Sequence, residues 1–421
     1  MLGTRSIQEE LQAIVGGDGL HPATSADANC GVSPRWVVEP ENEQQAAAVL
    51  AAANSAGIAV VPRGGGTKLD WGNPPKRADL ILSTARLNRI IEHAWADLTV
   101  TVEAGCTLQA LQAALAQHGQ RLAFDGLWPE RATVGGALST NDSGALRLRF
   151  GALRDLIIGA TLALPDGTLA SSGGKVVKNV AGYDLPKLAT GALGTLGVII
   201  RAVFRLHPLC PTASSLTFAP SSWQEMQRLL PSIQDSKLAH TSFQIRATSG
   251  SAPQADVLFE ATEAGQAAQK EHLRSLLGST PVTDSSSTRV WQARQDLFSS
   301  VNENSVVAKF SVLPSDIPKS IEWIERVSDP RKASWQAVIQ ATGLGWLRYE
   351  ADASWLGEAL VSLRTQFERA AGSFILLHRP TSLRTLEAWG NAGDALPLMH
   401  AVKFRLDPQN TLNPGRFVGG I

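Results

Sequence analysis

The chain has 421 residues, 44% of them hydrophobic and 18% charged, which is ordinary for a globular enzyme. It is too long for a single hydrophobic core, so we expect two or three domains. The 38 basic and 38 acidic side chains balance, which argues against nucleic acid or an anionic membrane surface as the main partner. No apolar run reaches the roughly 20 residues of a membrane span, and the N-terminus lacks the pattern of a signal peptide. A cytoplasmic protein is therefore expected.

Cysteine and histidine offer no pattern for a metal site. The three cysteines, Cys30, Cys106 and Cys210, are far apart and form no Cys-x-x-Cys pair. Neither zinc nor an iron–sulfur cluster carried by this chain is expected. The eight histidines are scattered, and no metal is predicted from them. Unreactive thiols in a reducing compartment are the simplest interpretation.

The first half of the chain begins with a predicted helix and continues as a βαβ unit. A short β-branched strand, an Ala-rich helix and a second strand follow one another, and the second strand runs directly into a glycine loop. A turn formed by Pro-Asp-Gly at residues 165–167 predicts a hairpin further on. The expected helices are 7–15, 41–56 and 108–118, and the expected strands are 35–38, 58–61, 79–82, 90–93, 98–102, 156–164, 169 onward and 197–206.

The pattern changes at about residue 210, where short β-branched runs alternate with amphipathic helical stretches. An antiparallel sheet with helices on one face is the simplest arrangement of these elements. The tail ends in DPQNTLNPGR at residues 407–416. The expected strands are 215–219, 241–245, 256–260, 305–312, 337–340 and 345–349, and the expected helices are 222–230, 263–277, 317–327 and 355–370.

The glycine loop PRGGGTK at residues 62–68 carries the clearest chemistry. Three successive glycines allow unusual backbone conformations and let a ligand approach the main chain closely. Their consecutive N–H groups can form an anion nest, and Arg63 and Lys68 add positive charge beside it. A diphosphate suits such a loop. The spacing is not that of a Rossmann fingerprint, and a plain tight turn is the alternative reading.

Two further segments are rich in small residues. Residues 133–144 (TVGGALSTNDSG) can lie against a flat or extended ligand and offer N–H groups and short hydroxyls to it. Residues 178–185 (KNVAGYDL) are followed by GALGTLGVI at 191–199, whose backbone can pair with the polar edge of a planar heterocycle. Taken singly, each of these segments has a purely structural interpretation as well.

Together the ordered motifs resemble the vanillyl-alcohol-oxidase family of flavoproteins, also called the PCMH-type FAD-binding family. The tail resembles the C-terminal signature of FAD-linked oxidases, in which the chain returns to the flavin domain. Within the family the closest resemblance is to the second FAD-binding ("E") subunit of glycolate oxidase, because GALG stands where catalytic relatives usually carry Gly-Ser-Glu-Gly. The resemblance implies an α+β fold, namely a two-subdomain FAD-binding domain and an antiparallel-sheet cap with helices on one face. The expected divisions are a lead-in 1–35, the FAD-binding domain 36–209, the cap 210–385 and the returning tail 386–421.

The family also implies which residues hold FAD. The first loop should hold the diphosphate, the second segment should flank the diphosphate and ribityl, and the third should lie by the adenine or isoalloxazine. A non-covalent flavin is expected, because the loops lack the His or Cys that tethers flavin in some members. The predicted FAD contacts are Pro62, Arg63, Gly64, Gly65, Gly66, Thr67, Lys68, Thr133, Val134, Gly135, Gly136, Ser139, Asn141, Gly144, Lys178, Gly194, Thr195 and Val198.

The resemblance implies a glycolate dehydrogenase subunit that oxidises glycolate, or a related 2-hydroxyacid, to glyoxylate. Its expected partners are a catalytic flavoprotein subunit and an iron–sulfur subunit that receives the electrons, and any membrane association runs through them. Oxidation also needs a base and a cation for the substrate carboxylate, and Arg246, Arg348 and His378 are the candidates. Two alternatives stay open: a self-sufficient FAD-dependent 2-hydroxyacid dehydrogenase, and a non-catalytic flavoprotein or scaffold subunit.

Overall fold

The chain divides into two compact units, each with its own core. The computed structural model describes residues 6–28, 31–175, 182–285, 288–299 and 301–421. Unit 1 is discontinuous, because most of unit 2 is inserted between its second and third segments. The short stretch 144–150 belongs to unit 2, and unit 2 runs on beyond residue 385. Unit 1 comprises Met1–Ser143, Gly151–Leu209 and Ala392–Ile421, and unit 2 comprises Gly144–Phe150 and Cys210–Asn391.

Unit 1 begins with a four-stranded sheet in the order β1-β2-β4-β3. Strands β2, β4 and β3 are parallel, while β1 pairs with β2 in the antiparallel sense. Helix α2 starts where Asn42 accepts a hydrogen bond from the amide of Gln45, the N-cap arrangement that its sequence favours. The apolar faces of α1 and α2 pack with these strands in one buried core. The bounds are α1 Ile7–Val15, β1 Leu20–Pro22, β2 Trp36–Val38, α2 Glu43–Ser55, β3 Val60–Arg63 and β4 Leu80–Ser83.

The second sheet of unit 1 is antiparallel, with the order β5-β6-β10-β8-β9. Its inner face packs with α3, α4 and α6 in a second core that includes Val102, Leu111 and Phe204. The tail adds helix α13 to this unit. The bounds are β5 Ile90–Ala94, β6 Thr99–Glu103, α3 Leu108–Ala116, β7 Gln120–Arg121, α4 Val134–Thr140, α6 Leu153–Leu156, β8 Ile157–Ala163, β9 Leu169–Gly173, α7 Leu185–Ala189, β10 Val198–Arg205, β11 His207–Pro208 and α13 Leu396–Leu406.

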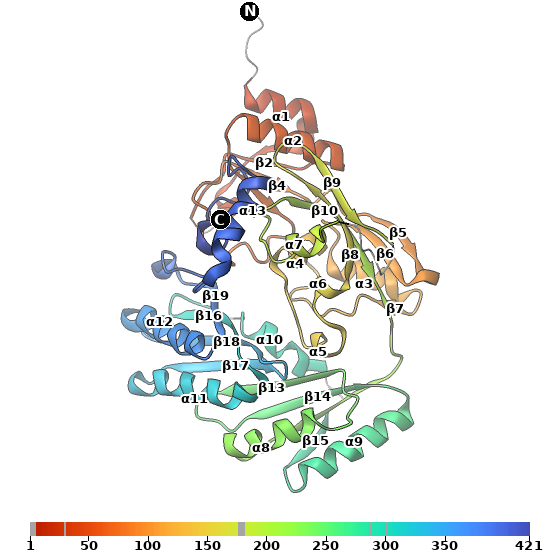
Figure 1. Cartoon of the computed structure of the whole chain (residues 1–421), viewed down its shortest axis with the longest axis vertical. Helices are drawn as coiled ribbons and strands as arrows, with labels where there is room; N and C mark the ends of the chain where they lie inside the picture. The colour runs from red at the N-terminus through yellow and green to blue at the C-terminus, as the bar shows by residue number, and fades with distance from the viewer. Residues whose placement is uncertain (1–5, 29–30, 176–181, 286–287, 300) are drawn as a thin grey trace, which may run out of the picture. The chain divides into compact units, whose positions relative to one another are not determined.

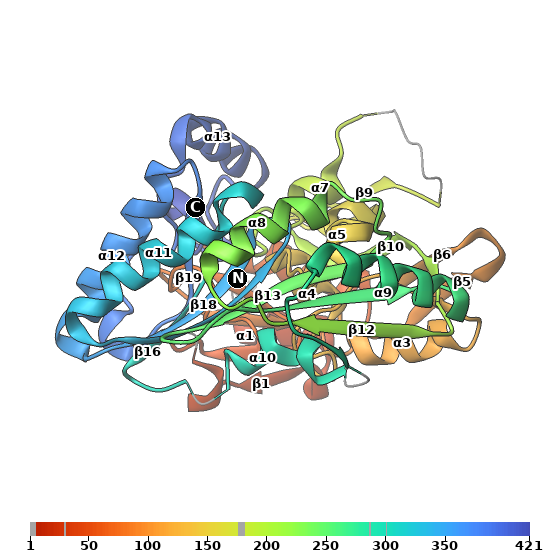
Figure 2. The same cartoon turned by 90° about the horizontal axis from the view of Figure 1, so that it is seen from below.

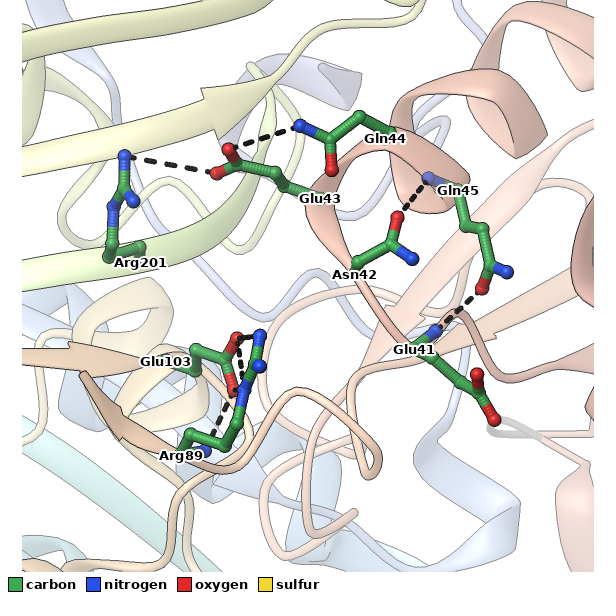
Figure 3. A network of polar contacts seen from close by, with 8 residues as sticks. All are labelled: Glu41, Asn42, Glu43, Gln44, Gln45, Arg89, Glu103 and Arg201. Atoms are coloured by element: carbon green, nitrogen blue, oxygen red, sulfur yellow. Dashed lines mark hydrogen bonds and ion pairs between the residues drawn. The ribbon is translucent and has the colours of Figure 1, made fainter.

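Polar contacts tie α2 and the loop before β5 to the second sheet of unit 1 (Figure 3). Glu43, in the first turn of α2, lies 3.8 Å from the guanidinium of Arg201 on β10. On β6, the buried carboxylate of Glu103 accepts from the Arg89 side chain at 2.7 Å and from its backbone amide at 2.7 Å. These contacts fix α2 and the loop before β5 against the second sheet.

Unit 2 is built on one eight-stranded antiparallel sheet, in the order β15-β12-β14-β13-β17-β18-β16-β19. Figures 1 and 2 show α8, α9, α11 and α12 on one face of it. Alternate residues of the strands, such as Phe243, Phe310 and Tyr349, are fully buried in the core beneath these helices. The bounds are α5 Arg147–Phe150, β12 Ala213–Phe218, α8 Trp223–Gln234, β13 Ser242–Thr248, β14 Gln254–Glu260, α9 Glu263–Leu277, β15 Val282–Ser285, α10 Ala293–Asp296, β16 Ser305–Ser311, α11 Ile317–Ser328, β17 Ser334–Gln340, β18 Leu344–Glu350, α12 Ala353–Arg369 and β19 Ser373–His378.

The predicted α+β class, with an antiparallel sheet and helices on one face, is confirmed. In the described part of the chain, elements that the sequence did not predict include β1, β15, β19 and α13. The second small-residue segment, for which no helix was expected, forms the short helix α4 at its core. None of the helices in the described part of the chain is both long enough and apolar enough to cross a membrane. Cys106 is buried and Cys210 half-buried, while Cys30 lies outside the described residues.

Candidate functional site

The glycine loop that follows β3 leaves several backbone amides available. Within the described residues, the amides of Gly65, Gly66 and Thr67 donate to no acceptor. Gly66 has a φ of 71°, a conformation that glycine adopts readily. Three consecutive amides are thus available for the anion nest that the sequence predicts.

Two glycines of the loop lie so close to the segment 131–133 that neither position has room for a side chain. A Cβ on Gly64 would stand 2.0 Å from Oγ1 of Thr133, and one on Gly65 would stand 1.7 Å from the carbonyl oxygen of Arg131. Both distances are far below van der Waals contact. Packing therefore requires glycine at positions 64 and 65, whereas backbone conformation favours glycine at position 66.

Helix α4 brings the second segment to the same place. Thr133 caps it, its Oγ1 accepting from the amide of Gly136 at 3.3 Å. Gly135 lets the helix rest on β6, because a Cβ there would stand 2.8 Å from the Cβ of Ala104. Small residues thus permit the close approach, and the buried Val134 and Leu138 hold the helix down.

The third segment is tied to the second by backbone hydrogen bonds. The amide of Leu193 donates to the carbonyl of Ser139 at 2.8 Å, and the amide of Gly191 donates to that of Leu138 at 2.9 Å. Gly194 follows with a φ of 71°. This turn places Gly194 beside the first loop, where a Cβ would lie 3.3 Å from the ring of Pro62.

These three segments line one hollow in unit 1. Thirteen of the eighteen predicted FAD contacts line it: all seven of the first loop, with Thr133, Gly135, Gly136, Ser139, Gly194 and Val198.

Five predicted contacts do not line the hollow. Val134 and Thr195 are buried away from it, and Asn141 lies at the C-terminal end of α4. Gly144 belongs to unit 2. Lys178 lies outside the described residues. The lining residues that sequence reasoning missed are Leu69, Thr84, Ala104, Thr140, Leu193, Ile199 and Arg416.

Three of the lining side chains carry positive charge, and Arg63 is held by an acid. Its Nη1 lies 2.5 Å from Oδ1 of Asp27, in the lead-in segment. The hydrogen bond from Arg63, with further bonds from Thr24, lowers the pKa of Asp27 from 3.8 to about 2. The carboxylate stays ionised at neutral pH and fixes the guanidinium at the rim of the glycine loop.

The other two cations of the hollow are almost fully buried. Nζ of Lys68 lies 5.7 Å from the ring of Trp71 and 5.3 Å from that of Trp128, and 3.5 Å from the carboxylate of Asp142. Arg416 comes from the tail motif, and its Nη2 donates to the carbonyls of Leu69 and Trp71, each at 2.6 Å. The motif NPGR was the only sequence signal for this residue.

The hollow therefore fits the cofactor that the resemblance implied. Its open amides and three cations suit a diphosphate, and its glycines would admit a flat or extended ligand at van der Waals distance. None of the described lining residues is a His or a Cys that could tether a flavin. Bound FAD would be held by the loop amides, with Arg63, Lys68 and Arg416 around it.

The candidate catalytic residues of unit 2 are already engaged. Arg246 donates to the buried carboxylate of Asp256 at 2.7 and 3.0 Å, and Asp256 also accepts from Gln244. Arg348 donates to the carbonyl of Ser299 at 2.7 Å and pairs with Glu350 on its own strand.

The three candidates lie on different strands of the sheet of unit 2. Arg246 on β13 and Arg348 on β18 are separated by β17, and His378 ends the edge strand β19. Arg348 lines a small hollow of unit 2 that neither of the other two lines. Among the described residues, no group of three or more His, Cys, Asp or Glu side chains is arranged to hold a metal.

Two family models match parts of the chain that include the hollow. Residues 34–173 match the model of the FAD binding domain, and residues 388–417 match that of the C-terminal domain of FAD linked oxidases. Alkyldihydroxyacetonephosphate synthase superposes with a TM-score of 0.76 at 16% identity, covering 98% of this chain and 86% of that one. p-Cresol methylhydroxylase superposes with a TM-score of 0.74 at 16% identity, covering 97% and 96%. These likenesses show the fold.

The fold is of the PCMH type, and the match to the FAD binding domain agrees with the predicted FAD cofactor. Three relatives are named for hydroxyacids or their oxidation. The glycolate oxidase subunit GlcD of Bacillus subtilis is 30% identical over 226 residues, 51% of this chain and 47% of the relative. The D-2-hydroxyglutarate dehydrogenase of Xanthomonas citri pv. viticola is 24% identical over 91% of this chain and 89% of the relative. The D-lactate dehydrogenase of Archaeoglobus fulgidus is 39% identical over 41% and 38%. The chain thus spans about half the length of the first of these relatives, and less of the third.

Proposed function

We propose that this protein is an FAD-linked 2-hydroxyacid dehydrogenase, acting as the FAD-binding subunit of a glycolate dehydrogenase complex. The observation that carries the proposal is the hollow of unit 1, in which open amides, close-packed glycines and three cations converge. Relatives named for glycolate, D-lactate and D-2-hydroxyglutarate support the substrate class. A catalytic flavoprotein subunit and an iron–sulfur subunit complete the proposed complex.

The chain's own residues would bind and orient the cofactor. The amides of Gly65 to Thr67 would donate to its diphosphate, and Arg63, fixed by Asp27, would neutralise part of the charge. Lys68 and Arg416 would place two buried cations around the same ligand. When bound, FAD supplies the acceptor for the hydride that leaves the hydroxyl-bearing carbon. The hydroxyl proton must go to a base. Loss of the hydride and of this proton together converts the hydroxyacid to the oxoacid.

A second candidate function is that of a relay or structural flavoprotein subunit that does not itself oxidise substrate. It is favoured by the state of the two predicted substrate arginines. Asp256 already takes the bidentate face of Arg246, formed by Nε and Nη2, and a substrate carboxylate that bound this face would leave the buried Asp256 without its counter-ion. Arg348 is similarly engaged by Glu350. Both arginines thus already have a carboxylate partner.

The experiment is an anaerobic absorbance titration of the purified, FAD-loaded chain with glycolate, D-lactate and D-2-hydroxyglutarate. Loss of the visible flavin absorbance band with one of these acids would identify the substrate and make the isolated chain a self-sufficient dehydrogenase. A band that bleaches only after the partner subunits are added would support the relay function. An R246M variant that bleaches as fast as the wild type would exclude Arg246 from substrate binding.

A further inference from the structure

The tail of the chain runs along the edge of the first sheet, next to the strand that leads into the glycine loop. Strand β3 is the last strand in that sheet, so one edge of it is open to another segment. The amide of Val60 donates to the carbonyl of Thr411 at 2.8 Å, and the amide of Asn413 donates back to the carbonyl of Val60 at 2.9 Å. Leu412, between them, is fully buried. The tail therefore fixes the base of the first FAD loop.

The same few residues also hold the third FAD segment. Nδ2 of Asn413 donates to the carbonyl of Leu193 at 2.6 Å, and Nζ of Lys403 donates to the carbonyl of Thr195 at 2.8 Å. These carbonyls flank Gly194, which lines the hollow. Two buried tail side chains thus hold the turn that faces the first loop.

A buried ion pair keeps the tail in the required shape. Lys403 lies 2.6 Å from the carboxylate of Asp407 and also donates to the carbonyl of Leu412 at 3.0 Å. The carboxylate of Asp407 accepts in turn from the amides of Thr411 and Leu412. At the far end, Arg416 reaches the end of the first loop through the carbonyl of Leu69. The segment 403–416 therefore contacts both ends of the first loop, and it also contacts the third segment.

We propose that the segment 403–416, the tail clamp, sets the spacing between the two loops of the FAD hollow, with Lys403 and Asn413 as positioning residues for the cofactor. The inference rests on the FAD binding of the proposed function and adds a cofactor-positioning role for the tail. It has a thermodynamic corollary. If the clamp raises the affinity for FAD, then bound FAD must stabilise the clamp by the same free energy.

The test compares a variant of the clamp with a variant elsewhere in unit 1, both in the full-length protein. Asn413→Ala removes the hydrogen bond to the loop carbonyl of Leu193. Gln112→Ala is the matched control, because the Gln112 side-chain amide on α3 also donates to a backbone carbonyl, that of Leu122 at 2.6 Å, but Gln112 lies outside the clamp and does not line the hollow. We expect both to lower the melting temperature, whereas the Kd for FAD rises about ten-fold in N413A and less than about two-fold in Q112A.

A second measurement needs no variant, so it decides the question even where N413A does not fold. Amide hydrogen exchange of the wild type, with and without FAD, should be about ten-fold slower at Leu412 and Asn413 in the loaded protein. Equal changes of Kd in the two variants, or tail exchange that FAD does not alter, would overturn the clamp. A wild type that binds no FAD would instead refute the proposed function, and the clamp with it.

Discussion

Replacing Gly65 by alanine should weaken FAD binding strongly while the protein still folds. The new Cβ would stand 1.7 Å from the carbonyl oxygen of Arg131, whereas real Cβ contacts essentially never fall below 3.0 Å. Either the loop or residue 131 must therefore move by about 1.3 Å. Residue 131 lies in a turn held by two hydrogen bonds to the carbonyl of Trp128. We expect the glycine loop to be the part that moves.

The expected rise of the Kd for FAD follows from the hydrogen bonds that the loop amides would make to the diphosphate. Losing one hydrogen bond from an amide to a charged diphosphate oxygen costs about 1.5–3 kcal/mol, which raises the Kd by roughly 10- to 150-fold. The same overpacking destabilises the folded protein by about 1–3 kcal/mol. For a unit of this size, that corresponds to a melting temperature lower by a few degrees, about 2–4 °C for each kcal/mol.

The assay is titration of apoprotein with FAD, followed by flavin fluorescence, together with a thermal melt. Gly174→Ala is the control, because a Cβ there would meet nothing within 4 Å and Gly174 does not line the hollow. It should leave both quantities unchanged. A folded G65A protein that binds FAD within about three-fold of the wild-type Kd would refute the loop amides as the diphosphate site.

Two further predictions concern buried and half-buried ion pairs. Asp27 has a pKa of about 2, below its ordinary 3.8, so its contribution is present above pH 3.8 and disappears as the pH falls through 2. In acid unfolding between pH 4 and pH 2, the wild type should lose roughly 0.5–1 kcal/mol more than D27N, since the pair with Arg63 is partly solvent-exposed; parallel curves would contradict this. Lys403→Met leaves the buried Asp407 without its counter-ion and should destabilise the protein by about 3–5 kcal/mol in chemical denaturation. Lys319→Met breaks an exposed pair and should lower the free energy of unfolding by less than about 1 kcal/mol. Equal losses of stability in the two lysine variants would show that burial of the pair is not the cause.

Local signals made several elements predictable from the sequence. The helices Ile7–Val15 and Glu263–Leu277 have the predicted bounds, because each combines strong helix formers with a capping Ser or Thr in front of it. The strand before the glycine loop is displaced by two residues, to Val60–Arg63, because the partner strand continues to Ser83 and pairs with Arg63. Pairing with a partner of distant sequence decides where a strand ends.

Other elements depend on contacts that no local pattern contains. Two adjacent glycines disfavour a helix, yet Val134–Thr140 is one, because Gly135 allows the helix to lie on Ala104 and bury its apolar side chains. The edge strand Ser373–His378 is a short apolar run that periodicity does not distinguish from a buried helix segment.

Dependence on contacts between distant residues also explains which site residues could be predicted from the sequence. The glycine loop reveals its chemistry in sequence, because consecutive glycines and flanking cations are adjacent in the chain. The contribution of Arg416 depends on its reaching Leu69, 347 residues earlier, and that pairing is set by the path of the tail. The neutralisation of Arg246 by Asp256 depends on the register of β13 and β14, in which the two residues lie on neighbouring strands.

The order in which the hollow is assembled has a consequence for biosynthesis. A ribosome delivers the glycine loop early, but the lining is incomplete until Arg416 has been made, after the whole of the inserted unit. A nascent chain that stops before this point has an open edge on β3 and no clamp across the third segment. The incomplete chain should therefore bind flavin more weakly than the full chain, so that tight flavin binding is expected only once the tail has been synthesised.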